Sequence, residues 1–200
     1  MGSLGCQFDF TGTDLPTESV TLLDGAFSVK YYLSCIVKQK KVPINSYYEL
    51  NYLAALQKQP VIPLKSEVGA ENALQIEIDC PNTNLDIVND VFVGRVHFVT
   101  AQKKMEEMKI LLKRKEAYRF SATEQPVQND WKDVMQYQVM DGAPVRNEVI
   151  PIKIRLSQIP NLTSSFKTET AKIEYQILIC VIDTDGQSYF KDVPVQFYRG

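Results

Sequence analysis

The most informative segment of this sequence is Tyr137-Gln-Val-Met-Asp-Gly-Ala-Pro-Val-Arg-Asn-Glu-Val-Ile-Pro-Ile-Lys-Ile-Arg-Leu156. It begins as a strand, and its second half alternates apolar and polar residues from Ile150 to Leu156, which predicts another strand. Between them stands Asp141-Gly142, a tight-turn dipeptide, because glycine adopts positive φ at little steric cost. The segment therefore predicts two strands joined by a hairpin-like corner.

Two apolar residues, Val139 and Met140, lie at the tip of this corner. Loop tips normally face water, so apolar side chains there need an explanation. One explanation is that they tuck under the loop as a small satellite of the core. The other is that Val139, Met140, Asp141 and Gly142 form a docking tip for another protein.

Outside this segment, apolar runs and alternating patterns predict further strands separated by turns. These strands are expected over residues 26–38, 74–78, 91–100, 134–140, 173–181 and 189–199, with a short one over 8–10 and a strand or short helix over 47–55. Asp183-Thr-Asp-Gly186 predicts a hairpin turn, and polar loops are expected over residues 120–130 and 157–170. Many strands without alternating helices indicate an all-β protein built as an antiparallel β-sandwich.

Residues 105–119 fit two patterns. Their Met, Glu, Lys and Leu content favours a helix, and Met105, Met108 and Leu112 have helical spacing. Met108, Ile110 and Leu112 also alternate with Lys109, Leu111 and Lys113, as in a strand. Because tertiary context overrides local propensity, and because the neighbouring segments are strands, we predict a strand.

A domain boundary is expected near Lys65. Pro60 and Pro63 lie in the segment before it, and proline stiffens the chain and removes a donor from a sheet. The sequence is thus divided into residues 1–65 and residues 66–200.

Composition excludes several classes of protein. Hydrophobic residues make up 44% of the 200 and charged residues 23%, which is ordinary for a globular protein. A net charge of −2 gives no support for nucleic-acid binding. No apolar run has the length of a transmembrane helix, and the first residues lack the pattern of a signal peptide. We therefore expect a reducing, cytosolic setting.

The residues that carry chemistry are sparse. The four cysteines, Cys6, Cys35, Cys80 and Cys180, show no C-x-x-C spacing, so a zinc site is not expected, and the last three are predicted to be buried free thiols. His97 is the single histidine, and no nucleotide-binding glycine motif occurs. We expect no catalytic activity, no metal and no cofactor.

One concentration of charge stands out. It comprises Lys103, Lys104, Lys109, Lys113, Arg114, Lys115 and Arg119. The cluster is either a solvated face of a sheet or a contact for an acidic partner or an anionic membrane surface.

Several blocks of the sequence resemble, in order, the vacuolar protein sorting-associated protein 26 family, the arrestin-like subunit of the retromer complex. The most specific is Met140-Asp-Gly-Ala-Pro-Val145 with Ile150-Pro-Ile152. The other matching blocks are residues 8–10, 18–37, 67–71 with 74–78, 93–98, 108–116, 188–191 and 196–199. Together they extend over nearly the whole chain.

The resemblance implies a non-enzymatic scaffold with arrestin-like β-sandwich lobes. Members of the family bind the end of the helical-solenoid retromer subunit, vacuolar protein sorting protein 35, through loops of the C-terminal lobe. The complex is cytoplasmic and peripheral on endosomal membranes, where it returns cargo to the Golgi or the plasma membrane. The alternative is another arrestin-like trafficking adaptor that does not join retromer.

The same resemblance assigns roles to individual residues. Val139 and Met140 match the solenoid-docking site, and Arg114 and Lys153 match basic positions beside it. Val68 and Phe190 match positions lining a pocket for cargo sorting motifs, shared with a sorting nexin, in which peptides add along a sheet edge.

This sequence departs from the family at its start, where strands that precede residue 8 in the family are missing. We therefore expect one complete C-terminal lobe and a partial N-terminal lobe. The partial lobe is expected either to be completed by another copy of the chain or to be a poorly ordered appendage.

Overall fold

The computed structural model describes residues 18–23, 25, 27–37, 44–53, 59–70, 74–121 and 123–200. Within these ranges the chain forms strands joined by turns, with a single 3-10 turn, η1 (Leu156–Gln158), and no α-helix. None of the described residues forms a helix that is long and apolar enough to cross a lipid bilayer.

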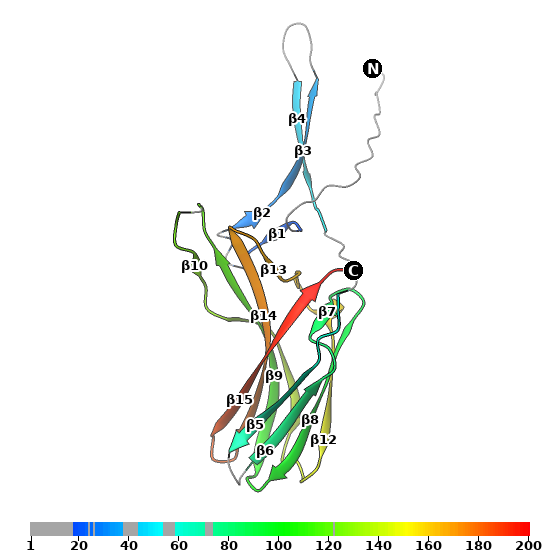
Figure 1. Cartoon of the computed structure of the whole chain (residues 1–200), viewed down its shortest axis with the longest axis vertical. Coiled ribbons are helices and arrows are strands. Elements are labelled where there is room, and N and C mark those ends of the chain that lie inside the picture. The colour runs from blue at the N-terminus through cyan, green and yellow to red at the C-terminus, as the bar shows by residue number, and fades with distance from the viewer. Residues whose placement is uncertain are drawn as a thin grey trace.

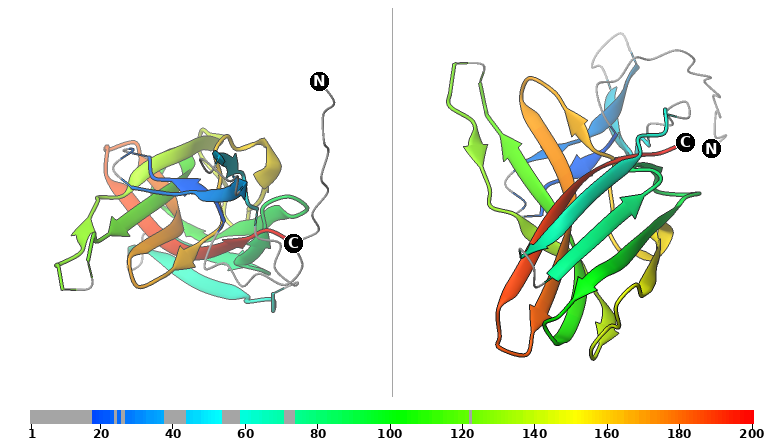
Figure 2. Two further views of the ribbon diagram at one scale, coloured as in Figure 1. Left: turned by 90° about the horizontal axis from the view of Figure 1, so that it is seen from above. Right: turned by 60° about the horizontal axis from the view of Figure 1, so that its bottom comes forward.

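Two layers of strands form the body of the molecule (Figures 1 and 2). The larger sheet contains β7 (Asn84–Asp86), β9 (Met105–Tyr118), β10 (Val127–Gln128), β11 (Lys132–Asp141), β13 (Phe166–Lys167), β14 (Ala171–Asp183) and β15 (Ser188–Tyr198). The smaller sheet has the order β12-β8-β6-β5 and contains β5 (Leu64–Ala70), β6 (Leu74–Cys80), β8 (Val91–Ala101) and β12 (Val149–Arg155). Among the described strands, all pairings are antiparallel except that of β7 with β15. The predicted all-β, antiparallel sandwich is confirmed.

The core lies between the two sheets. Side chains alternate between the faces of a strand, so each long strand sends every second residue inward. Ile110 and Leu112 of β9 and Ile76 and Ile78 of β6 are buried in this way. Burying one such side chain contributes about 1.5–3 kcal/mol before the cost in chain entropy.

β9 settles the ambiguity of its sequence in favour of a strand. It pairs with β14 along nearly its whole length and with β11 on its other side. A strand held on both edges loses no backbone hydrogen bonds to solvent, and its apolar face is covered. These tertiary gains outweigh the helical propensity of its Met, Glu, Lys and Leu residues.

The segment from Tyr137 to Leu156 is a crossover between layers. β11 pairs with β9 in the larger sheet, whereas β12 pairs with β8 in the smaller one. The two strands predicted from this segment are therefore present, but the hairpin-like corner is wrong, because they do not pair with each other. The loop between these strands, with its flanking residues 139–149, is called the crossover loop, and it lies at one end of the sandwich (Figure 1).

Residues before the expected boundary at Lys65 also enter the core. β1 (Val20–Thr21) pairs with β2 (Ser28–Val29), and the side chains of Val20 and Leu22 are buried in the main core. The ring of Phe27 stacks on that of Tyr118, with 5.9 Å between centroids. A separate lobe over residues 1–65 stays a prediction, but part of that range packs into the sandwich.

A two-stranded hairpin, β3 (Tyr31–Val37) with β4 (Ile44–Leu50), projects from the opposite end to the crossover loop (Figure 1). Large side chains such as Tyr32, Tyr47 and Tyr48 are exposed on it. Its completion by another copy stays a prediction, and the strand expected over residues 8–10 lies outside the described residues.

Two smaller expectations need correction. The loops predicted over residues 120–130 and 157–170 contain the short strands β10 and β13. Cys80 and Cys180 are buried free thiols as predicted, but Cys35 is exposed because its hairpin is not covered. Burial raises the pKa of the Cys80 thiol to about 11, so it is unreactive at neutral pH. Cys6 lies outside the described residues.

Candidate functional site

The predicted docking tip lies where β11 ends. A bulge between Gln138 and Met140 shifts the register of β11 against β9. Val139 and Met140 are half-buried and pack against the core, whereas Asp141 and Gly142 are exposed. Gly142 has a φ of 118°, which favours glycine, and its N–H donates to the Glu106 carbonyl at 2.8 Å. The side chains of Val139 and Met140 thus contact the core and still reach solvent.

The loop after the tip presents an apolar residue that the sequence analysis missed. Pro144 is buried, and Val145 next to it is 67% exposed. Val149, at the start of β12, is also exposed. In the sequence, Val145 stands between Pro144 and Arg146 in a predicted turn. This pattern alone does not show whether the valine side chain is exposed or buried.

Arg114 does not lie beside the tip. It faces Lys132 on β11, whereas the tip residues Met140 and Asp141 face Met108 and Glu107. Six residues of extended strand span about 20 Å. The Arg114 side chain is also buried, at 2% exposure. The structure therefore does not bring Arg114 into a surface with Val139 and Met140.

Arg114 belongs instead to a buried polar cluster. Its guanidinium forms an ion pair with Glu116, which is equally buried, and lies 6.0 Å from the centre of the Tyr175 ring. The Glu116 carboxylate accepts the Leu23 N–H at 3.1 Å from each oxygen. These contacts hold the segment that joins β1 and β2 against the sandwich.

A second buried carboxylate, Glu18, lies just before β1. It accepts the Ser164 N–H at 2.9 Å and the Arg199 Nε–H at 3.2 Å. Each buried charge therefore has a partner, as burial requires. The cluster is structural, because its charges are directed inward.

Lys153 is exposed on the outer face of β12, where it pairs with Val93 of β8. It lies four residues along the strand from Val149, or about 13 Å. Lys153 is therefore accessible to a partner.

The basic cluster is largely neutralised by neighbouring acids. Lys109 pairs with Glu107 at 2.8 Å and Lys113 with Asp133 at 2.8 Å. These contacts support the solvated-face interpretation for the residues of β9.

Lys103 has a different role, in a network at the turn between β14 and β15. Its Nζ lies 2.9 Å from Oδ2 of Asp183, whose side chain is buried. The Asp183 carboxylate also accepts the Gln187 N–H at 2.9 Å and the Tyr189 hydroxyl at 3.2 Å. The hydrogen bond from Lys103, with those from Gln187 and Tyr189, holds the pKa of Asp183 below its ordinary value of 3.8. The network therefore fixes the β14–β15 turn.

Val68 and Phe190 lie on neighbouring sheet edges. β5 ends the smaller sheet, and β15 lies against it from the larger sheet without pairing to it. Val68 is half-buried and packs against the core, whereas Phe190 is 55% exposed. The structure therefore places β5 beside β15, but the Val68 side chain points towards the core and the Phe190 side chain towards solvent.

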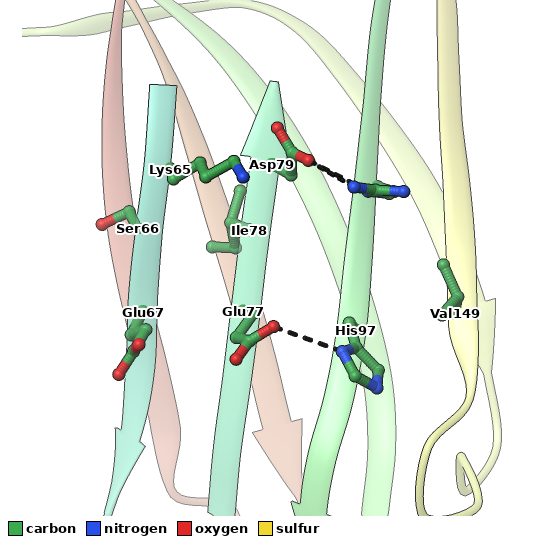
Figure 3. Close-up of a pocket in the computed structure, with 9 residues that line it drawn as sticks. Lys65, Ser66, Glu67, Glu77, Ile78, Asp79, His97 and Val149 are labelled. Atoms are coloured by element: carbon green, nitrogen blue, oxygen red, sulfur yellow. Dashed lines mark hydrogen bonds and ion pairs between the residues drawn. The ribbon is translucent and has the colours of Figure 1, made fainter. Parts of the chain in front are cut away.

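The outer face of the smaller sheet carries a polar hollow of about 720 Å³ (Figure 3). Arg95 Nη2 lies 2.6 Å from Oδ2 of Asp79, and His97 Nδ1 lies 3.3 Å from Oε2 of Glu77. Ser66 also lines the hollow, but its side chain points away from His97 (Figure 3). His97 thus has a carboxylate partner but no hydroxyl placed to act as a nucleophile in this hollow. Over the described ranges, no three His, Cys, Asp or Glu side chains are grouped to hold a metal ion.

Comparison with known proteins identifies the family. Residues 3–186 match the family of vacuolar protein sorting-associated protein 26. The protein of that name from Drosophila melanogaster is 30% identical over 139 residues, which are 68% of this chain and 28% of the relative. Vacuolar protein sorting-associated protein 26B from Danio rerio is 28% identical over 197 residues, 96% of this chain and 57% of the relative. The human protein of the same name is also 28% identical, over 96% of this chain and 56% of its own length.

Among solved structures, the sporulation control protein Spo0M from Bacillus subtilis superposes with a TM-score of 0.48 at 10% identity, over 64% of this chain and 51% of that one. The chain spans a little over half the length of the two vertebrate relatives. Because the family match extends over most of its residues, this chain belongs to the vacuolar protein sorting-associated protein 26 family, whose arrestin-like β-sandwich agrees with the two antiparallel layers described above.

Proposed function

We propose that this chain is a non-enzymatic scaffold and adaptor of the retromer cargo-recognition complex, which sorts proteins from endosomes to the Golgi and the plasma membrane. Family membership supports the sorting role. The proposed partners are the helical-solenoid subunit, vacuolar protein sorting protein 35, together with sorting nexins and cargo-tail peptides. The chain would be held peripherally on endosomal membranes by these partners.

The proposed docking surface is the crossover loop, residues 139–149. The observation that carries this proposal is that apolar side chains gather at an exposed end of the sandwich, with Val139 and Met140 half-buried and Val145 exposed. Apolar residues that remain accessible in this way are typical of protein interfaces. Lys153 stays a candidate contact on β12, whereas Arg114 is buried and is not part of the proposed surface.

The proposed cargo site is the pair of edges where β5 meets β15. Neither edge is hydrogen-bonded to the other strand, so main-chain N–H and C=O groups are available to an extended peptide. Phe190 offers an exposed apolar contact beside them, and Val68 lines the inner side. Main-chain pairing would supply affinity, and these two residues would supply selectivity.

A pull-down with the purified solenoid subunit tests the docking proposal. We expect the double variant Val139→Asp with Met140→Asn to lose binding, because two charged or polar groups would enter an apolar contact. Val127→Asp is the control, since Val127 is an exposed valine that pairs with Tyr118 at the far end of β9.

Because Val139 and Met140 also contact the core, thermal unfolding and circular dichroism of each variant must accompany the pull-down. Retained binding by a folded double variant would refute the docking surface. A folded chain of native sequence that never binds the solenoid would favour the alternative, an arrestin-like trafficking adaptor outside retromer.

A further inference from the structure

The open edge of β5 carries two charged side chains on the outer face of the smaller sheet. β5 ends that sheet, and among the described strands it pairs only with β6. Lys65 and Glu67 are exposed on the outer face and line the polar hollow (Figure 3). Side chains alternate between the faces of a strand, so Val68 lies on the inner face, where it packs against the core. A strand added at this edge would therefore place alternate side chains beside Glu67 and Lys65.

Glu67 has an acid as its neighbour across the sheet. It lies opposite Glu77 of β6, and Glu77 lies opposite His97 of β8, with 3.3 Å between Oε2 and Nδ1. Figure 3 shows the Glu77 side chain directed to His97. Within the part of the chain that the structure describes, Glu67 forms no ion pair. Like charges directly opposite each other destabilise a sheet, so a cation on the open side of β5 would offset this repulsion.

The next row of charges across the sheet has the opposite balance. Lys65 lies opposite Asp79, and Asp79 lies opposite Arg95, whose Nη2 is 2.6 Å from Asp79 Oδ2. Because Arg95 pairs with the acid of this row, Lys65 has no ion pair among the described residues. An acidic side chain on the open side of β5 would therefore be favoured beside Lys65.

We infer that the β5 edge selects an extended peptide that places a basic residue beside Glu67 and an acidic residue beside Lys65. This inference rests on the proposed cargo site, and it names the charge pattern that the site takes. Antiparallel addition is favoured, because an antiparallel ladder is slightly more stable than a parallel one. A peptide running in that direction meets Val68, Glu67, Ser66 and Lys65 in turn. It therefore carries, in order, an apolar residue, a basic residue, any residue and an acidic residue.

Fluorescence anisotropy with two synthetic peptides tests this charge pattern. One peptide has the central sequence Val-Arg-Thr-Glu, and the other has the two charges exchanged, Val-Glu-Thr-Arg. We expect the native chain to bind the first with a Kd at least about fivefold lower, because two attractive cross-strand pairs replace two repulsive ones. This preference should shrink as the salt concentration is raised, since salt screens exposed charges.

Exchanging the two charges on the protein supplies the matched variant. Lys65→Glu with Glu67→Lys should reverse the order of the two peptides, a result that damage to the fold cannot produce. Arg155→Glu is the control, because Arg155 is exposed on β12 at the opposite edge of the same sheet. This control should keep the native preference.

Equal affinity for the two peptides, or an unchanged order in the charge-exchanged variant, would overturn the charge selection. If Phe190→Asp then lost the binding of both peptides, the cargo site itself would still stand. Binding of neither peptide by the folded native chain would overturn the cargo site as well. The solenoid pull-down reports on the docking surface independently of all these outcomes.

Discussion

Arg114 and Glu116 are oppositely charged side chains that are both buried. A buried charge is stable only while its partner is present, so removing one member of the pair leaves the other uncompensated. We predict that Glu116→Gln lowers the free energy of unfolding by about 3–5 kcal/mol. Urea denaturation measures this loss of stability. The substitution should also release the segment around Leu23, because the Glu116 carboxylate accepts the Leu23 N–H.

Glu124→Gln provides the matched control, because Glu124 is exposed and its change should stay within about 0.5 kcal/mol. Equal, small effects for both substitutions would show that the buried pair does not stabilise the fold.

Asp183 gives the protein a defined sensitivity to acid. Because its pKa is lowered in the folded state, its contribution to stability is fully present above about pH 3.8 and is lost as the pH falls through the folded value. We predict that Asp183→Asn lowers the melting temperature at neutral pH. The difference from the native chain should shrink as the pH is lowered towards about 3. A difference that stays constant over this range would contradict the role given to the Lys103–Asp183 pair.

At the residue scale, the burial of Arg114 and Glu116 could be predicted from the sequence, whereas the exposure of Val145 could not. In a strand over residues 105–119, every second side chain points to the same face, so Arg114 and Glu116 lie on the inward face with Ile110 and Leu112. Their burial therefore follows from the alternation of side chains along the strand. The exposure of Val145 was not predictable, because it depends on hydrogen bonds to Phe98, which is distant in sequence.

At the element scale, alternation located the strands but not their partners. The long strands expected from periodicity are all present in the structure, including β9, for which composition favoured a helix. The crossover of residues 137–156 could not be foreseen, because an Asp-Gly turn looks the same whether the next strand returns to its own sheet or joins the other. Short strands such as β10 and β13 carry too few residues to show a period.

The β5–β6 hairpin depends on a glycine. A Cβ at Gly69 would lie 1.9 Å from the Leu74 carbonyl oxygen, closer than any atom can approach without moving the backbone. We predict that Gly69→Ala destabilises the protein by about 1–3 kcal/mol, as overpacking does. Gln75→Ala, at the exposed position paired with Gly69, should change stability by less than about 0.5 kcal/mol. Chemical denaturation compares the two, and indistinguishable midpoints would contradict the close approach.

At the scale of the whole molecule, stability resides in the sandwich rather than in the β3–β4 hairpin. Ile110 is completely buried between the sheets, whereas Ile36 is 58% exposed on the hairpin. We predict that Ile110→Ala lowers the free energy of unfolding by about 2–5 kcal/mol. The same substitution at Ile36 should cost less than about 0.5 kcal/mol. Comparable losses at both positions would mean that the hairpin is packed in solution.

The boundary near Lys65 stays a prediction from prolines, and contacts made by residues before it are long-range in sequence. The segment carrying Val20 and Leu22 lies before the prolines, yet its side chains complete the core at one end of the sandwich. The contacts that hold it run from Glu18 to Ser164 and from Leu23 to Glu116. Such long-range pairs leave no local pattern in the sequence.

Hydrogen–deuterium exchange of the chain, alone and saturated with the purified solenoid subunit, tests most directly whether the crossover loop is the docking surface. We predict that amides of residues 139–149 become protected in the complex, while those of the β3–β4 hairpin and the outer face of the smaller sheet exchange as before. Protection confined to those other regions, with residues 139–149 unchanged, would contradict the account.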